Sequence, residues 1–225
     1  MKKNILLLGV CVLMAGVVHE ASAQSPDLAN ESRDLSRVVR HPDGTMAPES
    51  VSPEEYGAFL SAVFDEWIAC DLGRTDVQLF AEMAGILSGK PANLCSLAPT
   101  CGRAVVVEED GSVYSCDHFV SPEYKLGNIR QDGLRNLVDG PIQKAFGEHK
   151  RSSLTSECRA CPYLPLCGGG CPKDRFSASA DGEAGQYYLC LGLKAFFAHA
   201  VPRLKEVMRL SRLGKSPGEI MEKLK

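Results

Sequence analysis

Apolar residues recur with helical spacing in the stretch that follows Ser52. Ser52-Pro53-Glu54-Glu55 combines an N-cap, a proline in the first turn and a capping-box glutamate. The apolar face of the predicted helix carries Tyr56, Leu60, Val63, Phe64 and Trp67. We expect this helix to end near Gly73, and a second short helix to cover 81–87 before Gly89.

The pattern changes to strand alternation after residue 104. Val105–Glu109 and Ser112–Ser115 flank Asp110-Gly111, a dipeptide typical of two-residue hairpin turns. This part of the chain therefore predicts a β-hairpin with Cys116 at the end of its second strand.

Short amphipathic helices are expected over 134–138 and 142–146, and cysteine-rich loops over 158–171. From Tyr187 onward the pattern is helical again, with a kink expected at Pro202 and a last capped helix after Ser216. The predicted fold class is α+β: a small cysteine-rich domain with a short hairpin, ligand-bearing loops and flanking helices.

The amino terminus follows the pattern of a secretory signal peptide. Lys2 and Lys3 precede an apolar run, and Ala21 and Ala23 fit a small-residue cleavage site. The alternative is a buried strand or helix. Residues 1–23 are thus predicted to be signal-like, and the polar, proline-containing residues 24–51 to be a linker or lead-in.

Composition narrows the class of protein. The chain has 225 residues, of which 44% are hydrophobic and 24% charged, with a net charge of -3. These values argue against wholesale disorder and against an integral membrane bundle. They also show no basic excess of the kind that supports binding to nucleic acid.

Ten cysteines are the unusual feature of this chain. Eight of them follow the spacing Cys95-x5-Cys101-x14-Cys116, then Cys158-x2-Cys161-x5-Cys167-x3-Cys171-x18-Cys190. Thiolates are soft ligands that suit iron–sulfur clusters and zinc, and four for each site satisfy either metal. Cysteine number and spacing therefore support two four-cysteine metal sites without choosing the metal.

Two details favour clusters over zinc. Gly168-Gly169-Gly170 lets the backbone approach closely between two cysteines, and only one C-x2-C pair is present. A disulfide framework in an exported protein is the third interpretation. Clusters are favoured, and zinc and disulfides stay open.

Several motifs resemble the SPASM domain of the anaerobic sulfatase-maturating enzymes. The resemblance runs from about Val38 to Leu210, and every spacing between the cysteines fits it. It is carried by Cys101-Gly102-Arg103, Tyr114-Ser115-Cys116-Asp117-His118-Phe119-Val120, Tyr124-Lys125-Leu126-Gly127-Asn128-Ile129 and Cys167-Gly168-Gly169-Gly170-Cys171-Pro172-Lys173.

The resemblance implies a radical S-adenosylmethionine (SAM) oxidoreductase that converts a cysteine or serine of a sulfatase to Cα-formylglycine. Two auxiliary 4Fe-4S clusters would be held by a first set, Cys95, Cys101, Cys116 and Cys171, and by a second set, Cys158, Cys161, Cys167 and Cys190. Asp117 matches the proposed general base of the family. The implied organisation is a helical lead-in over 52–94, a two-cluster SPASM domain over 95–210 and a C-terminal helix over 211–225.

The C-x3-C-x2-C motif that binds the SAM-cleaving cluster in this family is absent from the sequence. We therefore expect this chain alone to be inactive. Either it is a truncated part that uses a radical SAM domain in trans and an electron donor such as a flavodoxin or ferredoxin, or it is a stand-alone electron-transfer module. An exported protein stapled by disulfides or zinc is the third hypothesis.

The cofactors implied by the resemblance predict a cytoplasmic protein, whereas the signal-like start predicts a periplasmic or secreted one. Sec-type export would deliver thiols to an oxidising compartment, so the two predictions conflict. Among the remaining residues, Cys70 is expected to be a small buried residue. Arg103 and Lys173 are candidates for raising a cluster's potential, with solvated surface charge as the alternative.

Overall fold

The computed structural model describes residues 38–41 and 43–224, and it divides into two units, 1–50 and 51–225. In the first unit Arg40 and Met46 form an isolated antiparallel bridge, and the Ser50 hydroxyl donates to the Val39 carbonyl at 2.8 Å. The predicted signal-like segment lies outside the described residues. The domain boundaries derived from the sequence stay predictions.

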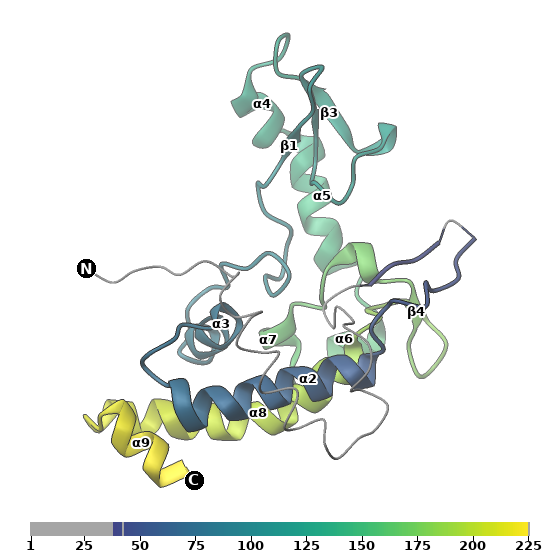
Figure 1. Ribbon diagram of the computed structural model, residues 1–225. Helices are drawn as coiled ribbons and strands as arrows, with labels where there is room; N and C mark the ends of the chain where they lie inside the picture. Colours follow the sequence, from purple (N-terminus) through teal and green to yellow (C-terminus); the bar gives the residue numbers. More distant parts are fainter. Residues whose placement is uncertain (1–37, 42, 225) are drawn as a thin grey trace. The chain divides into compact units, whose positions relative to one another are not determined.

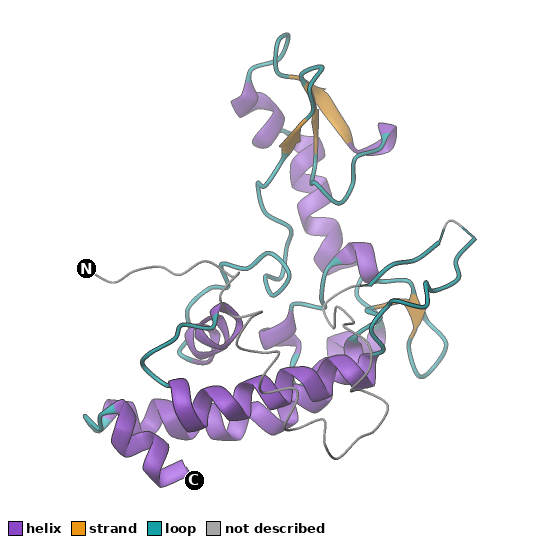
Figure 2. Cartoon of the chain, in the orientation of Figure 1, coloured by secondary structure: helices purple, strands orange, loops and turns teal. Residues whose placement is uncertain are grey.

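The second unit is an α+β arrangement, as predicted, in which helices accompany two small antiparallel sheets (Figure 2). Helix α2 spans Pro53–Glu66 and continues into a π-helical turn over Trp67–Asp71. The predicted capping box is confirmed: the Ser52 hydroxyl accepts from the Glu55 amide, and the Glu55 carboxylate accepts from the Ser52 amide.

Helix α8, Cys190–Arg212, runs beside α2 (Figure 1). Their backbones touch near the start of α8, because a Cβ on Gly192 would lie 1.9 Å from the Pro53 carbonyl oxygen. Only glycine permits this approach. The prediction placed the helical start at Tyr187, but the helix begins at Cys190 and continues through Pro202.

Helices α3, Gln78–Leu87, and α9, Pro217–Leu224, complete the helical layer. The apolar core lies between these four helices. Its fully buried side chains include Phe64, Ile68, Phe80, Met83, Phe196, Phe197, Leu204 and Leu210. Cys70, predicted to be buried, is exposed on the π-helical turn. Within the described part of the chain, no helix is both long and apolar enough to cross a membrane.

The predicted hairpin is present as β1, Val106–Val107, and β2, Ser112–Tyr114. A third strand that the sequence did not indicate, β3 over Lys125–Asn128, pairs with β2 across a register shift. The strands are short, and their alternation is too brief to be detected by periodicity alone.

Helices α4, Leu134–Val138, and α5, Pro141–Ser152, follow the sheet. The first has the predicted bounds, whereas the second is longer than predicted. Helix α5 departs from the usual amphipathic pattern, in which apolar residues are buried and polar ones exposed. Its residues Gln143, Gly147 and Lys150 are buried, whereas Ile142 is 57% exposed.

The region predicted as cysteine-rich loops contains two short helices, α6 over Ser156–Ala160 and α7 over Leu164–Cys167. Thr155 caps α6 by accepting from the Cys158 amide at 3.2 Å. The small sheet of β4, Ser177–Ala178, and β5, Ala184–Gln186, then leads into α8. The loop prediction is therefore wrong in part, because one-turn helices position the cysteines.

Candidate metal centre

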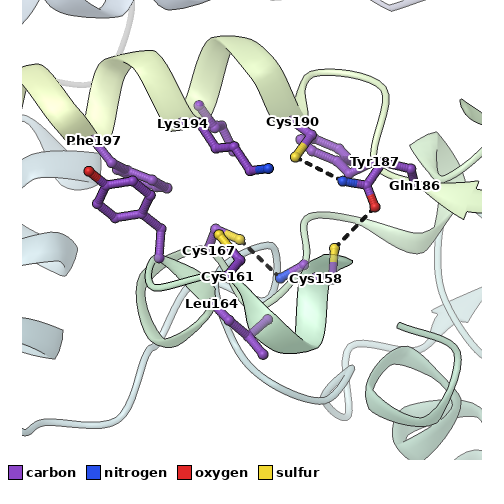
Figure 3. Close-up of a pocket in the computed structure, with 12 residues that line it drawn as sticks. Cys158, Cys161, Leu164, Cys167, Gln186, Tyr187, Cys190, Lys194 and Phe197 are labelled. Atoms are coloured by element: carbon purple, nitrogen blue, oxygen red, sulfur yellow. Dashed lines mark hydrogen bonds between the residues drawn. The ribbon is translucent and has the colours of Figure 1, made fainter. Parts of the chain in front are cut away.

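The four cysteines of the second set line one cavity. Cys158 lies in α6, Cys161 directly follows that helix, Cys167 ends α7 and Cys190 begins α8. The sulfur atoms face a common space, toward which the Lys194 amine extends (Figure 3). Apolar side chains close the cavity: Tyr163, Leu164, Leu193 and Phe197.

Gln186 connects two thiols of the second set. Its Nε2 donates to Cys190 Sγ at 3.1 Å, and its Oε1 accepts from Cys158 Sγ at 3.3 Å (Figure 3). The Thr155 hydroxyl donates to the same Oε1 at 2.6 Å, which fixes the orientation of the amide. Gln186 is only 5% exposed, so these contacts are shielded from water.

The glycines between Cys167 and Cys171 bring backbone close to sulfur. Gly169 N–H donates to Cys167 Sγ at 3.2 Å. Gly168, Gly169 and Gly170 all have positive φ, and a Cβ on Gly168 would lie 2.4 Å from the Ala98 carbonyl oxygen. N–H donors directed at sulfur stabilise thiolate charge, as iron–sulfur proteins require.

Burial raises the pKa of the Cys190 thiol to about 11, and burial likewise raises the pKa of Cys167. The neighbouring thiol of Cys158 raises both values further, while Lys194 lowers that of Cys190 and the Gly169 N–H lowers that of Cys167. Without a metal, these thiols are protonated near neutral pH. Metal binding would therefore release protons.

The first set is assembled from more distant parts of the chain. Cys95 and Cys101 lie on the loop after α3, Cys116 follows β2, and Cys171 follows the glycines. Burial is the main cause that raises the pKa values of Cys101, Cys116 and Cys171. Charge interactions raise them further: with Cys95 for Cys101, with Cys171 for Cys116 and with Cys101 for Cys171. The structure thus places the four cysteines of the second set around one cavity, and the grouping of the first set stays a prediction.

Helix α5 holds the first set from one side. Gln143 Nε2 donates to the Gly102 and Ser115 carbonyls, both at 3.1 Å, and so connects the residues beside Cys101 and Cys116. Lys150 Nζ donates to the Cys95, Ser96 and Ala98 carbonyls.

Arg175 lies beside both sets. Its guanidinium donates to the Gly169 carbonyl at 2.9 Å and to the Lys150 carbonyl at 2.6 Å. Burial lowers its pKa, while Cys158 and Cys167 of the second set and Cys101 and Cys171 of the first set raise it.

Asp117 is at the exposed end of this region. Its Oδ1 accepts from Cys116 Sγ at 3.1 Å, and that hydrogen bond, followed by the charge of His118, lowers the pKa of the carboxyl group. His118 Nδ1 lies 3.7 Å from the same oxygen. The carboxylate is therefore ionised, accessible and held next to Cys116.

The donor set fits iron–sulfur chemistry. Soft sulfur ligands surround a partly apolar cavity, N–H groups face two of the sulfurs, and cations lie beside both sets. Across the described residues, no two cysteines are joined as a disulfide, and no three His, Cys, Asp or Glu side chains are gathered closely enough for one metal ion.

Sequence reasoning missed the polar residues that support the cysteines. The proximity of Arg103 to Cys101 in the sequence predicts a cation beside a cluster, yet Arg103 is exposed and pairs with Asp139 at 2.6 Å. The cations and amides beside the sulfurs come from α5, β5 and α8. A polar stripe at positions 143, 147 and 150 was the available signal, but such a stripe ordinarily indicates a solvent-facing side.

Comparisons with known proteins show which kind of domain this chain resembles. Residues 95–162 match the SPASM family, an iron–sulfur cluster-binding domain. The chain is 41% identical over 195 residues to a serine-type anaerobic sulfatase-maturating enzyme of Bacteroides thetaiotaomicron, covering 87% of this chain and 47% of that protein. It is 35% identical over 166 residues to a cysteine-type enzyme of Clostridium perfringens, covering 70% and 43%.

Solved structures show the same relation. The structure of native anSMEcpe with bound AdoMet and the Kp18Cys peptide matches with a TM-score of 0.62 and 34% identity, over 72% of this chain and 44% of that one. This chain thus spans less than half the length of the relatives that it matches.

Proposed function

Because the chain carries a SPASM domain of the kind found in anaerobic sulfatase-maturating enzymes, we propose that its eight cysteines hold two auxiliary 4Fe-4S clusters. In this proposal the first cluster is bound by Cys95, Cys101, Cys116 and Cys171, and the second by Cys158, Cys161, Cys167 and Cys190. The domain serves the oxidation of a sulfatase cysteine or serine to Cα-formylglycine, in the cytoplasm.

The observation that carries the proposal is the cavity lined by all four cysteines of the second set. Cys190 at the start of α8 lines the same cavity as Cys158 of α6 and Cys167 of α7, although the sequence separates them. Packing of the helical layer positions Cys190, because α8 is fixed against α2 at Gly57 and Gly192.

Asp117 is proposed as the general base that accepts the proton of the substrate thiol or hydroxyl. It is exposed and ionised, as a base that meets a peptide must be. Its hydrogen bond from Cys116 requires the protonated thiol. A thiolate at Cys116 has no proton to donate, so the carboxylate would then be available to substrate.

When bound, the clusters would supply a route for the electrons that leave the substrate. Cleavage of S-adenosylmethionine is assigned to a radical SAM domain outside these 225 residues, because the C-x3-C-x2-C motif is absent from them. The proposed partners are the sulfatase polypeptide and an electron donor such as a flavodoxin or ferredoxin.

Iron and acid-labile sulfide per chain, measured after anaerobic reconstitution, test the proposal. We expect about eight of each, which corresponds to two 4Fe-4S clusters. Zinc in place of iron, or oxidised thiols, would replace the proposal with a structural role.

A stand-alone electron-transfer module is the second candidate, and the missing C-x3-C-x2-C motif favours it. Binding of a sulfatase-derived peptide separates the two, with Asp117→Asn as the matched variant, since it keeps the shape and removes the charge. Loss of binding or of turnover in this variant, measured with a complementing radical SAM domain, supports the maturase. Two clusters without any peptide binding support the electron-transfer module.

A further inference from the structure

The buried side of α5 is polar and faces the first cysteine set. Gln143, Gly147 and Lys150 recur at intervals of four and three residues, so they share one face of the helix. The Gly147 carbonyl accepts from the Cys101 amide at 3.1 Å, and a Cβ on Gly147 would lie 2.7 Å from the Cys101 carbonyl oxygen. All three residues thus contact the segments that carry the first set.

Lys150 is the centre of this face. The side chain is fully buried, at 0% exposure, and Nζ donates to the carbonyls of Cys95 at 2.6 Å, Ser96 at 3.0 Å and Ala98 at 2.5 Å. Three acceptors around one nitrogen require three N–H donors, which only the ammonium form provides. The contacts therefore describe a buried positive charge.

This charge lacks the usual partner. Within the described part of the chain, no carboxylate forms an ion pair with Lys150. A buried charge without an opposite charge costs several kcal/mol. Burial lowers the pKa of Lys150, and the neighbouring Arg175 lowers it further, whereas the thiols of Cys101, Cys171 and Cys95 raise it. The acidic groups beside these two cations are thus thiols. Thiolates at these positions would complete the charge balance.

We propose that Lys150 is a positioning residue of the first cysteine set, whose ammonium holds the Cys95–Ala98 loop and balances the thiolate charge assembled there. This inference rests on the proposed function, in which that set binds a cluster. Lys150 acts through the loop carbonyls and through its charge, and no contact of Nζ with a sulfur atom is required.

The second set offers a matched control. Lys194 lies beside Cys190, but its side chain is 32% exposed and it is paired with the Glu157 carboxylate. The two lysines therefore differ in burial and in the presence of a carboxylate partner, while each lies beside one cysteine set. Removal of Lys150 should affect the first set, and removal of Lys194 should leave the first set intact.

The experiment uses the full chain with Lys150→Met, Lys150→Gln and Lys194→Met, each reconstituted anaerobically. For Lys150→Met we expect iron to fall from about eight to about four per chain through loss of the first cluster, whereas Lys194→Met should retain the first cluster. Lys150→Gln keeps hydrogen-bond donors and removes the charge. Any first cluster that it retains should be reduced only at a more negative potential, which a purely structural role would not produce.

Two backgrounds assign the loss to a site. With Cys158→Ala and Cys161→Ala, only the first set is complete, and adding Lys150→Met should bring iron near zero. With Cys95→Ala and Cys101→Ala, the same addition should leave about four iron atoms. Retention of the second cluster in Lys150→Met shows that the chain still folds.

Unchanged iron and unchanged potentials in both Lys150 variants would overturn the inference. Equal loss from both sets would also overturn it, because Lys150 would then act on the fold as a whole. Absence of clusters from the wild-type chain would instead reject the proposed function on which the inference rests.

Discussion

The two cysteine sets are built on different physical supports. The second set is seated against the helical layer, where α6, α7 and the start of α8 close an apolar cavity around it. The first set lies on loops and a strand end, and buried polar groups of α5 hold its segments through backbone carbonyls. The cysteines of the second set are thus positioned by hydrophobic packing, and those of the first set by hydrogen bonds.

This difference indicates that the second set depends less on its metal for order. The apolar core between α2, α3, α8 and α9 includes none of the first-set residues. Burial of apolar area stabilises that layer whether or not metal is present. Within the described part of the chain, this core does not extend to the first set, so we expect metal coordination to contribute more to the order of that set.

Removal of iron should give the largest difference between the two cysteine sets, measured as hydrogen exchange of their backbone amides. We expect amide exchange over residues 95–118 to accelerate on the order of a hundredfold in the metal-free chain, while the buried face of α8 stays protected. Hydrogen-exchange mass spectrometry of the reconstituted and chelated forms measures both regions together. Equal acceleration along α8 would show that the helical layer also depends on the clusters.

Substitution of the two buried glutamines should affect different cysteine sets: Gln143 the first set and Gln186 the second. Gln143→Leu leaves the Gly102 and Ser115 carbonyls without their donor, at a cost of about 1–3 kcal/mol for each, and should weaken the first site. Gln186→Leu removes the N–H bond to Cys190 Sγ and should lower the potential of the second cluster.

Gln131→Leu, at an exposed position, is the control for both glutamine variants. Iron content and redox titration report the two effects. Similar behaviour of the two buried glutamine variants would contradict the distinction between the sites.

High pH should destabilise the metal-free chain. Burial raises the pKa of Cys190 from 9.0 to about 11, so the folded state binds more protons than the unfolded state between these values. The free energy of unfolding should therefore decrease as the pH rises from 9 to 11. Denaturant titrations of the chelated protein test this sign, and an increase over that range would contradict it.

The smallest effect should come from the partly exposed ion pair beside the second set. Glu157→Gln removes the carboxylate that pairs with Lys194, and such pairs contribute about 0–1 kcal/mol. Thermal unfolding of the reconstituted protein should change little. A loss above about 2 kcal/mol would show that this pair supports the cavity more than its exposure indicates.

The fold was predictable where local chemistry determines it. The capping box at Ser52 and the turn at Asp110-Gly111 specify their elements within a few residues, and both are present in the structure. The strands of two or three residues at 177–178 and 184–186 carry no usable periodicity. The predicted loops around Cys158 proved to include one-turn helices for the same reason.

The candidate site was predictable only in its cysteines. Their grouping came from the resemblance to a family, and the assignment of individual ligands stays a proposal. Gln143 and Lys150 were not predictable, because a polar helical stripe normally faces water and only the tertiary contacts show that this one is buried.

The interleaving of the two sets has a consequence for the order of assembly. Cys171 belongs to the first set but lies between Cys167 and Cys190 of the second. The loop from Cys95 to Cys171 is more than twice as long as the loop from Cys158 to Cys190. Each doubling of loop length adds about 0.6 kcal/mol to the free-energy cost of closing the loop. Closing the shorter loop first fixes Cys171 in advance, so maturation of this domain should proceed from its C-terminal half to its N-terminal half.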